Sequence, residues 1–446
     1  MSDKSELIKN LGSFPKFGQG ICFARLAVLL EQLQLTSFIE QTPKLAITGS
    51  NGKGSVARIT NAILSEAGLN TGLFTSPHFL EFNERYLNMQ TEVDYALLNR
   101  TLQQMFATIR RVEQQTREQF GVFEVLFVLA IAVFKTLQTN FLVFEAGIGG
   151  RYDPVRLLKS SLTVLTTVDL EHSELLGTSK ELIAYDKMDA CANGGKVVLG
   201  NIAPKLVTKL EAFGELNQIE VIVSGKWVSV EPDKRDTVAK SGQNTWWVTE
   251  EPYAPFRLTT PLQGEFAKYN LETSMFVSNL VLKHLTHEQR AVIYQNAVAN
   301  LTVPGRLQMI SQAPPILVDS AHTEQSYQIL FASLRKDFPK QKLVFLIGQS
   351  EGREPQALID GLKQLASCVI VTKASHKGAN PNVLYDHLEL HHVEAEKYAD
   401  LNKALTVALK RREERDCLLV VCGSLFLAGE VNAIIKGQDN KNLFLY

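Results

Sequence analysis

The sequence predicts an α/β fold built around a mostly parallel sheet. Short apolar runs alternate with segments of helical periodicity along most of the 446 residues. One run, residues 141–146, is almost wholly apolar, as is typical of a central parallel strand buried on both faces. A glycine-rich turn joins another strand-like run to a helical one. In a parallel α/β sheet such turns lie at the carboxyl ends of the strands, so we expect ligands to bind there.

Length and composition suit a soluble globular protein of two or three domains. A chain of 446 residues is too long for one compact core, and we predict domains at 1–298 and 299–446. Hydrophobic residues make up 45% and charged residues 21%, which is typical of a soluble protein. The formal net charge of −1 argues against a nucleic-acid-binding surface but allows a local anion pocket.

The cysteines and the N-terminus favour a cytoplasmic protein. The five cysteines lack metal-site spacing and form no dense disulfide framework. Nothing at the N-terminus resembles a signal peptide. The longest apolar stretch, around 125–134, is too short to span a bilayer, so we expect a buried helix there and no membrane association.

The predicted elements of the first domain follow in order. An apolar run at Lys44–Thr48 indicates a strand, and helical spacing over 56–67 ends at Gly68. Helical periodicity also marks 24–33, 95–118 and 123 onward, and further strands are expected at 72–75, 162–167 and 196–199. Residues 201–262 are patterned like antiparallel strands, and we interpret them as a β-rich outer edge.

The C-terminal part repeats the alternation on its own. A helical stretch over 269–285 leads to a predicted hinge at 301–305. Strands are expected at 316–319, 343–348, 368–373 and 418–422, with helices between them. The sequence therefore predicts a second, smaller α/β domain.

The turn after the first strand is a candidate phosphate loop. Its residues are Gly49, Ser50, Asn51, Gly52, Lys53, Gly54 and Ser55. Glycines let backbone N–H groups close on phosphate oxygens, the helix N-terminus adds positive potential, and a lysine can reach the terminal phosphates. The spacing is tighter than the usual eight-residue pattern, so an ordinary strand-to-helix turn is the alternative.

Polar groups at later strand ends could hold a metal ion. Glu145 closes the buried strand beside the predicted phosphate loop, where a carboxylate suits Mg²⁺, although a salt-bridged or capping acid is the alternative. His172 follows Asp169 and Glu171, and histidine is an acceptable Mg²⁺ or Mn²⁺ ligand when oxygens supply the rest. Lys187 is most simply a solvated helix residue.

Two residues of the C-terminal half could contact a nucleotide. Arg306 lies at the hinge and could clamp a phosphate across an interdomain cleft. Asp319 ends the first strand of the second domain and could accept hydrogen bonds from ribose hydroxyls. A hinge salt bridge and a helix cap are the respective alternatives.

In this order the motifs resemble the folylpolyglutamate synthase and dihydrofolate synthase family, a branch of the Mur-type ATP-dependent amide ligases. The similarity extends from near residue 20 to near residue 430, and its order and spacing are more specific than any single motif. The matching segments are 48–55, 73–78, 82–85, 145–151 with Asp153, 172–177, 183–187, 304–306, 319–322 and 423–425.

The resemblance implies a fold and a reaction. The expected fold is a Mur-ligase-like P-loop ATPase domain followed by a Rossmann-like C-terminal domain that closes over ATP and binds glutamate. The expected reaction joins L-glutamate to dihydropteroate or to a (tetrahydro)folate polyglutamate through an acyl phosphate. A monomer is the family expectation. The sequence does not choose between the two acceptors.

The resemblance also implies roles for individual residues. Ser76 and Glu145 would hold one Mg²⁺, and His172 and a carbamylated Lys187 a second; Lys53, His172 and Lys187 would serve catalysis. The implied nucleotide contacts are Gly49, Asn51, Gly52, Lys53, Gly54, Ser55, Asn270, Arg306, Asp319 and His322. The implied contacts to the pterin-bearing substrate are Ser76, Pro77, His78, Phe82, Asn83, Arg85, Arg151 and Asp153.

The chain departs from the family pattern at several positions. They are Val155, Arg156, Glu171, Asp186, Met188, Ala267 and Thr323, in place of the usual threonine, asparagine, aspartate, glutamate, alanine, glutamine and asparagine. The predicted metal and phosphate residues are retained. Arg156 adds a cation near the ligand loops, which favours a more anionic acceptor.

Two other functions remain open. A divergent ligase could join an amino acid to a different carboxylate. A catalytically silent, nucleotide-binding regulatory or scaffold protein could have kept only the loop. Phosphate release with a panel of acceptor acids separates all three.

Overall fold

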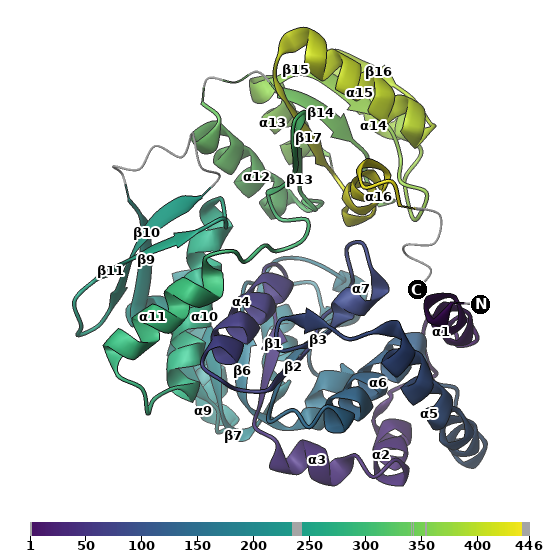
Figure 1. Ribbon diagram of the computed structural model, residues 1–446, viewed down its shortest axis with the longest axis vertical. Helices are drawn as coiled ribbons and strands as arrows, with labels where there is room; N and C mark the ends of the chain where they lie inside the picture. Colours follow the sequence, from purple (N-terminus) through teal and green to yellow (C-terminus); the bar gives the residue numbers. More distant parts are fainter. Residues whose placement is uncertain (1, 234–242, 340, 342, 353–354, 439–446) are drawn as a thin grey trace.

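The computed structural model describes residues 2–233, 243–339, 341, 343–352 and 355–438. The described chain forms three sheets with helices packed around them. Figure 1 shows the C-terminal sheet and its helices stacked on the larger N-terminal part, with the smallest sheet at the flank. The α/β prediction is confirmed, while the boundary at 298/299 stays a prediction.

The largest sheet has the order β4-β3-β2-β5-β1-β6-β7-β8. Its pairings are parallel except those of β3 with β2 and with β4, at one edge. All five residues of β5 are buried, as predicted for a central strand. The strands are β1 (Lys44–Thr48), β2 (Thr71–Phe74), β3 (Tyr86–Asn88), β4 (Thr91–Glu92), β5 (Phe141–Glu145), β6 (Ser160–Leu165), β7 (Cys191–Leu199) and β8 (Glu220–Val223).

Helices cover both faces of this sheet because its strands are apolar on both. Leu142 and Phe144 of β5 point into one core, and Phe141 and Val143 into the other. The first face carries α1 (Asp3–Leu11), α2 (Phe23–Gln32), α5 (Tyr95–Thr116) and α6 (Val122–Thr136), with α8 (Lys180–Met188) and α9 (Pro204–Leu216) over β6 and β7. The second face carries α4 (Lys53–Glu66), α10 (Glu265–Val281) and α11 (His287–Val298). Short elements complete this part: α3 (Thr36–Gln41), α7 (Ser173–Leu176), η1 (Phe82–Arg85), η2 (Pro154–Leu158) and η3 (Ser224–Lys226).

Residues 201–262 are only partly β-rich, which corrects the sequence prediction. The segment begins with the helix α9, whose Leu206 and Leu210 are buried one turn apart, and continues into β8, which extends the large sheet. The antiparallel pattern holds for β9 (Val228–Pro232), β10 (Asn244–Glu250) and β11 (Phe256–Thr260). Residues 234–242 of this predicted region lie outside the described residues.

The C-terminal sheet has the order β12-β13-β17-β14-β15-β16, parallel except for β12. The strands are β12 (Gln308–Gln312), β13 (Pro315–Val318), β14 (Leu343–Ile347), β15 (Ala366–Val371), β16 (Ala395–Lys397) and β17 (Leu418–Cys422). One face packs on α12 (Glu324–Asp337), α13 (Gln356–Leu365) and α14 (Pro381–Leu390), and the other on α15 (Leu401–Arg415) and α16 (Leu425–Ile435). The four strands predicted from sequence are all present.

The two large parts share a core contact. Phe79 and Leu80, in the loop after β2, belong to the apolar cluster formed by the second face of the C-terminal sheet. Through this contact, the loop that follows β2 connects the largest sheet with the C-terminal sheet. Within the described residues, none of the helices has both the length and the apolar character that crossing a bilayer requires.

Candidate active site

The predicted phosphate loop joins β1 to α4. Gly49 has φ 138° and Gly52 has φ 86°, and a Cβ on Gly49 would lie 2.0 Å from Oγ1 of Thr166, so this position requires glycine. The end of β6 fixes the loop: the Asn51 N–H donates to Thr167 Oγ1 at 2.9 Å, and Thr166 Oγ1 donates to the Asn51 carbonyl at 2.6 Å. The 14-residue helix α4 therefore starts at a fixed turn, and the N–H groups at a helix start are suited to binding an anion.

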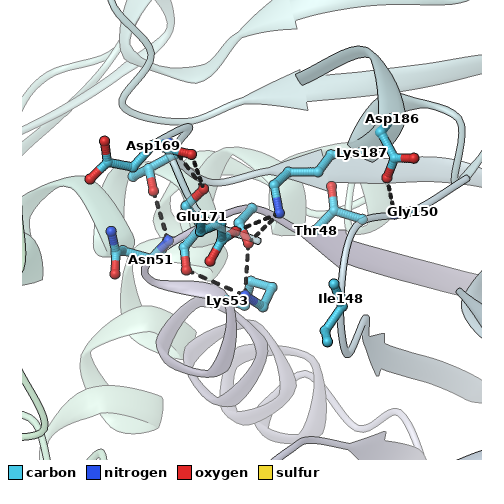
Figure 2. A network of polar contacts seen from close by, with 12 residues as sticks. Thr48, Asn51, Lys53, Ile148, Gly150, Asp169, Glu171, Asp186 and Lys187 are labelled. Carbon is cyan, nitrogen blue, oxygen red and sulfur yellow. Dashed lines mark hydrogen bonds and ion pairs between the residues drawn. The ribbon is translucent and has the colours of Figure 1, made fainter. Parts of the chain in front are cut away.

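Two lysines converge on this loop (Figure 2). The ammonium groups of Lys53 and Lys187 donate to the same carbonyl, that of Gly49, at 2.7 and 3.1 Å. Lys187 lies on α8 and its side chain is 1% exposed, so it is not the solvated helix residue that its sequence position suggests. Burial, and next the charge of Lys53, lower the pKa of Lys187.

Glu171 places a negative charge beside these two lysines. Its carboxylate accepts a hydrogen bond from Lys187 Nζ at 2.8 Å. Burial alone would raise the pKa of Glu171, but Lys53 and then Lys187 outweigh it and lower that pKa to about 2. The longer glutamate, where the family has aspartate, forms a buried ion pair here.

We expect Glu171→Gln to destabilise the fold at neutral pH by about 2 kcal/mol, because the folded-state pKa lies well below the ordinary value of 4.5. A carboxyl with a depressed pKa stabilises the protein above pH 4.5 and loses that contribution as the pH falls toward 2. The difference between wild type and variant in urea unfolding should therefore shrink from pH 7 to pH 4. An equal difference at both pH values would contradict the ion pair.

Ser76 and Glu145, the predicted first metal pair, lie together. The Ser76 N–H donates to Glu145 Oε2 at 3.1 Å. A Cβ on Gly54 would lie 3.4 Å from that same oxygen, so the carboxylate touches the start of α4. Burial raises the pKa of Glu145, and Lys53 and Arg306 partly oppose this. Among the described residues, the Glu145 carboxylate forms no short-range ion pair.

His172, a predicted ligand of the second metal ion, lies on a different segment from Ser76 and Glu145. It is exposed, adopts φ 46° and begins α7, directly after Glu171. No group of three or more His, Cys, Asp and Glu in the described ranges could hold a metal ion by itself. Mg²⁺ does not require such a group, because it usually keeps several waters and binds one or two protein oxygens together with substrate phosphates.

A first cavity lies between the phosphate loop and the C-terminal sheet. Its lining includes most of the predicted nucleotide residues: Asn51, Gly52, Ser55, Asn270, Arg306, Asp319 and His322. A Cβ on Gly52 would lie 2.8 Å from Asn270 Oδ1, which places the asparagine against the loop. Asn51 Nδ2 also donates to Gln325 Oε1 on α12 at 3.1 Å, so the two halves meet across this cavity.

Asp319 lines the first cavity and also accepts hydrogen bonds from the surrounding backbone. Its carboxylate accepts hydrogen bonds from the N–H groups of Leu307 and Ala321, each at 2.8 Å. Burial raises the pKa of Asp319, and Arg306 partly opposes this. The charge of Arg306 therefore opposes the rise of two pKa values, that of Asp319, which lines the first cavity, and that of Glu145.

Ser76 lines a second cavity. It is lined by Ser76, Pro77, Arg85 and Asp153 of the predicted substrate residues, together with apolar groups such as Phe123 and Ile148. Asp153 Oδ2 accepts from the N–H groups of Gly147 and Ile148 at 2.9 and 3.2 Å and so shapes the turn after β5. Burial raises the pKa of Asp153 to about 6.

The other predicted substrate residues do not line this cavity. His78, Phe82 and Asn83 are buried, and His78 Nδ1 accepts from Arg85 Nε at 2.9 Å. Asn83 Nδ2 donates to the Val93 carbonyl at 3.1 Å. Arg151 instead forms an ion pair with Asp189. Of the motif that contains His78, Phe82, Asn83 and Arg85, Arg85 is the residue that lines the cavity.

Comparisons with known proteins relate this chain to one group of ligases. Residues 305–425 match the family model described as Mur ligase, glutamate ligase domain. The chain is 27% identical to a folylpolyglutamate synthase of Lacticaseibacillus casei over 97% of this chain and 99% of that protein. It is 24% identical to a dihydrofolate synthase/folylpolyglutamate synthase of Bacillus subtilis over 87% and 90%. The family resemblance is confirmed.

Solved structures extend the likeness to the fold. A Mycobacterium tuberculosis folylpolyglutamate synthase complexed with ADP and AMPPCP superposes with a TM-score of 0.85 at 23% identity, covering 98% of this chain and 100% of that one. E. coli FolC in complex with DHPP and ADP gives 0.81 at 20% identity, covering 98% of both chains. The predicted Mur-ligase architecture is therefore confirmed.

The departures from the family pattern have local explanations. Val155 is buried in the first core, and Thr323 caps α12 by accepting from the Ser326 N–H. Arg156 lies over the Phe23 ring and is absent from the residues that line the second cavity, which disfavours the idea that it contacts an anionic acceptor. Ala267 is buried and lines the first cavity.

One part of the second cavity was not anticipated from the sequence. Residues 16–22, before α2, form its outer wall, with Lys16, Phe17 and Ile21 among the lining side chains. Arg25 secures this segment by donating to the Gln19 carbonyl, and two hydrogen bonds of 2.8 and 2.6 Å to Glu124 hold the guanidinium in place. The available signal was the Gly18-Gln19-Gly20 turn flanked by apolar residues.

Proposed function

We propose that this protein is an ATP-dependent ligase that joins L-glutamate to a pterin-bearing carboxylic acid. The acceptor would be dihydropteroate, a (tetrahydro)folate polyglutamate, or both. The observation that supports this most strongly is the short path from the phosphate loop to the second cavity. Asn51, Gly52 and Ser55 of the loop line the first cavity. Ser76 lines the second cavity, and its N–H donates to Glu145, whose carboxylate lies against the start of α4.

The chemistry follows from these positions. Lys53 and the N–H groups of α4 hold the transferring phosphoryl group while a carboxylate oxygen of the acceptor attacks it and ADP leaves. The glutamate amine then attacks the acyl carbon, loses a proton and expels phosphate. Mg²⁺, held at Ser76 and Glu145, would neutralise charge on the phosphate oxygens. The contact between Asn51 and Gln325 joins the two halves at the first cavity. Closure of the halves there would help to exclude water, to which an acyl phosphate is sensitive.

The direct test is release of phosphate with ATP, Mg²⁺, L-glutamate and a panel of acids. Product formation with dihydropteroate or folates supports the proposal. Release only with an unrelated acid would favour a divergent ligase. Binding of ATP without release for any acid would favour a silent nucleotide-binding protein.

We infer that Lys187 and His172 serve a second metal position, with Lys187 carbamylated. The lowered pKa of Lys187 leaves more neutral amine than an ordinary lysine has at neutral pH. Its nitrogen could then attack CO₂, lose a proton and become an anion, once released from Glu171.

Lys187→Ala is therefore expected to reduce turnover by about 10- to 100-fold, with partial recovery when a short carboxylic acid is added. Wild type treated with ¹³CO₂ should give a carbamate carbon signal that the variant lacks. Lys180→Ala is the matched control, because that lysine lies on the same helix with its side chain 50% exposed. Full turnover of Lys187→Ala, or no ¹³C signal in wild type, would contradict the inference.

A further inference from the structure

One face of helix α12 is tied to the N-terminal part of the protein at two places. Gln325, Ile329 and Ser333 recur at helical spacing, so they lie on the same side of α12. Near the start of the helix, Gln325 Oε1 accepts from Asn51 Nδ2 of the phosphate loop at 3.1 Å. About two turns later, Ser333 Oγ accepts from the N–H of Glu265, the first residue of α10, at 3.3 Å.

The stretch of α12 between these two contacts forms part of the wall of the first cavity. Ile329 and Leu330 line that cavity, and α4 and α10 contribute Ile59 and Phe266 to the same lining. Figure 1 shows α12 on the side of the C-terminal part that faces α4 and α10. The predicted nucleotide cavity is therefore covered by a helix that belongs to the other half of the protein.

Both partners of the Asn51–Gln325 hydrogen bond are held in place. The main chain of Asn51 is fixed by the two threonines at the end of β6. At the start of α12, Thr323 Oγ1 accepts from the Ser326 N–H at 3.3 Å, and Ser326 Oγ accepts from the Thr323 N–H at 2.8 Å. Because both partners are fixed, this hydrogen bond forms only when the two halves lie close together.

The contacts at the two ends of α12 are weak enough to break without unfolding either half. Each is one neutral hydrogen bond, and loss of such a bond changes an equilibrium by about 2- to 10-fold. The ion pair beside Ser333, between Lys336 and Glu265, has a distance of 3.9 Å, and its side chains are 51% and 47% exposed. A nucleotide that enters a cavity between the halves requires them to separate, and contacts of this strength permit that.

We propose that Gln325 and Ser333 are positioning residues that hold α12 over the first cavity while the acyl phosphate exists. This rests on the proposed function and adds to it the residues that keep water from the intermediate. Gln325 contacts the phosphate loop at Asn51, close in sequence to Lys53. With α12 displaced, water would attack the acyl phosphate and give back the free acid and phosphate in place of the amide. These two contacts therefore determine how much of the ATP consumed yields amide.

The experiment measures phosphate released and amide formed in the same reaction, with L-glutamate below saturation. In wild type the two amounts should be nearly equal. In Gln325→Leu and in Ser333→Ala the excess of phosphate over amide should grow by about 2- to 10-fold, and further in the double variant. Saturating L-glutamate should reduce this excess, because the amine competes with water. The KM for the acceptor should not change, since neither residue lines the second cavity.

Two further variants separate positioning from folding. Gln325→Glu keeps an oxygen that can accept from Asn51 and should stay close to wild type. Gln328→Leu is the matched control, because Gln328 lies on the exposed side of the same helix and donates to Glu324 Oε1 at 3.2 Å. It should leave the ratio of phosphate to amide unchanged. Lower turnover and a lower Tm with an unchanged ratio in Gln325→Leu and Ser333→Ala would overturn the proposal, because both residues would then only support the fold.

Calorimetric titration with ATP and Mg²⁺ tests the same contacts without turnover. If α12 closes over the nucleotide, the Kd for ATP should rise by about 2- to 10-fold in Gln325→Leu and stay the same in Gln328→Leu. An unchanged Kd together with an unchanged ratio of phosphate to amide would also refute the inference. If wild type makes no amide with any acid, the proposed function fails, and the titration alone then decides whether these contacts hold α12 over the nucleotide.

Discussion

Replacing Lys53 with alanine is expected to reduce glutamate-dependent ADP formation by about 10³-fold or more. Lys53 is the first residue of α4, and its ammonium lies against the Gly49 carbonyl at 2.7 Å, within the phosphate loop itself. Among the described residues, Lys53 is the only lysine or arginine in the first turn of this helix. In the variant the transferring phosphoryl group would lose its nearest fixed positive charge, and that charge matters most in the transition state.

The fold of the Lys53→Ala variant should be intact, because Lys53 is only half-buried and makes no ion pair shorter than 4 Å with a described carboxylate. Thermal unfolding with and without ATP separates a loss of catalysis from a loss of structure. Lys44→Ala is the matched control: this lysine lies at the opposite end of β1 and also donates to a carbonyl, that of Thr42, at 3.2 Å. Near-normal turnover of Lys53→Ala would refute the role assigned to the loop.

The phosphate loop and the strands could be predicted because their signals are local. Gly49 and Gly52 occupy backbone conformations that favour glycine, and the apolar run of β5 is buried on both faces. The position of Glu145 then followed from its place at a strand end. Parallel strands bring their carboxyl ends to one edge, so sequence order alone located this acid near Lys53.

The role of Lys187 could not be predicted from local pattern, because its burial depends on contacts made across 138 residues. Its helix α8 carries exposed Leu182 as well as buried Ile183, so periodicity gives no clear inward face. Only the family resemblance singled it out. The ion pair with Glu171 likewise depends on how β6 and α8 pack.

The residues of one sequence motif also differ in whether they line the second cavity, which the sequence could not show. His78, Phe82, Asn83 and Arg85 belong to one motif, yet Arg85 alone lines the second cavity. The motif is needed largely for shape: the Glu84 carboxylate accepts hydrogen bonds from the N–H groups of Phe79, Leu80 and Glu81, each at 2.8 Å. A sequence motif near a site therefore indicates the wall of a cavity as readily as its contacts.

The second large effect is expected for Glu145→Gln, which should lower turnover by about 10²- to 10³-fold and leave stability equal or higher. The substitution keeps the shape and an oxygen that can accept from the Ser76 N–H at 3.1 Å. It removes the negative charge that would hold Mg²⁺ beside the phosphate loop. Turnover should fall most at low Mg²⁺ concentration.

The stability part of this prediction follows from the raised pKa of Glu145, which burial causes. A carboxyl whose folded-state pKa exceeds its unfolded value binds its proton more tightly when folded, so ionising it at neutral pH opposes folding. Glutamine carries no charge, and the variant should therefore unfold at the same or a higher temperature than wild type at pH 7. This advantage should decrease as the pH is lowered toward 4.5, where wild-type Glu145 takes up its proton.

Glu272→Gln is the matched control for Glu145→Gln. Burial also raises the pKa of Glu272, and its carboxylate accepts from the Val230 N–H at 3.0 Å, away from both cavities. Both variants should behave alike in unfolding, but only Glu145→Gln should lose turnover, and it should lose most at low Mg²⁺ concentration. If Glu145→Gln is destabilised and still active, Glu145 is a structural acid and the metal must be held elsewhere.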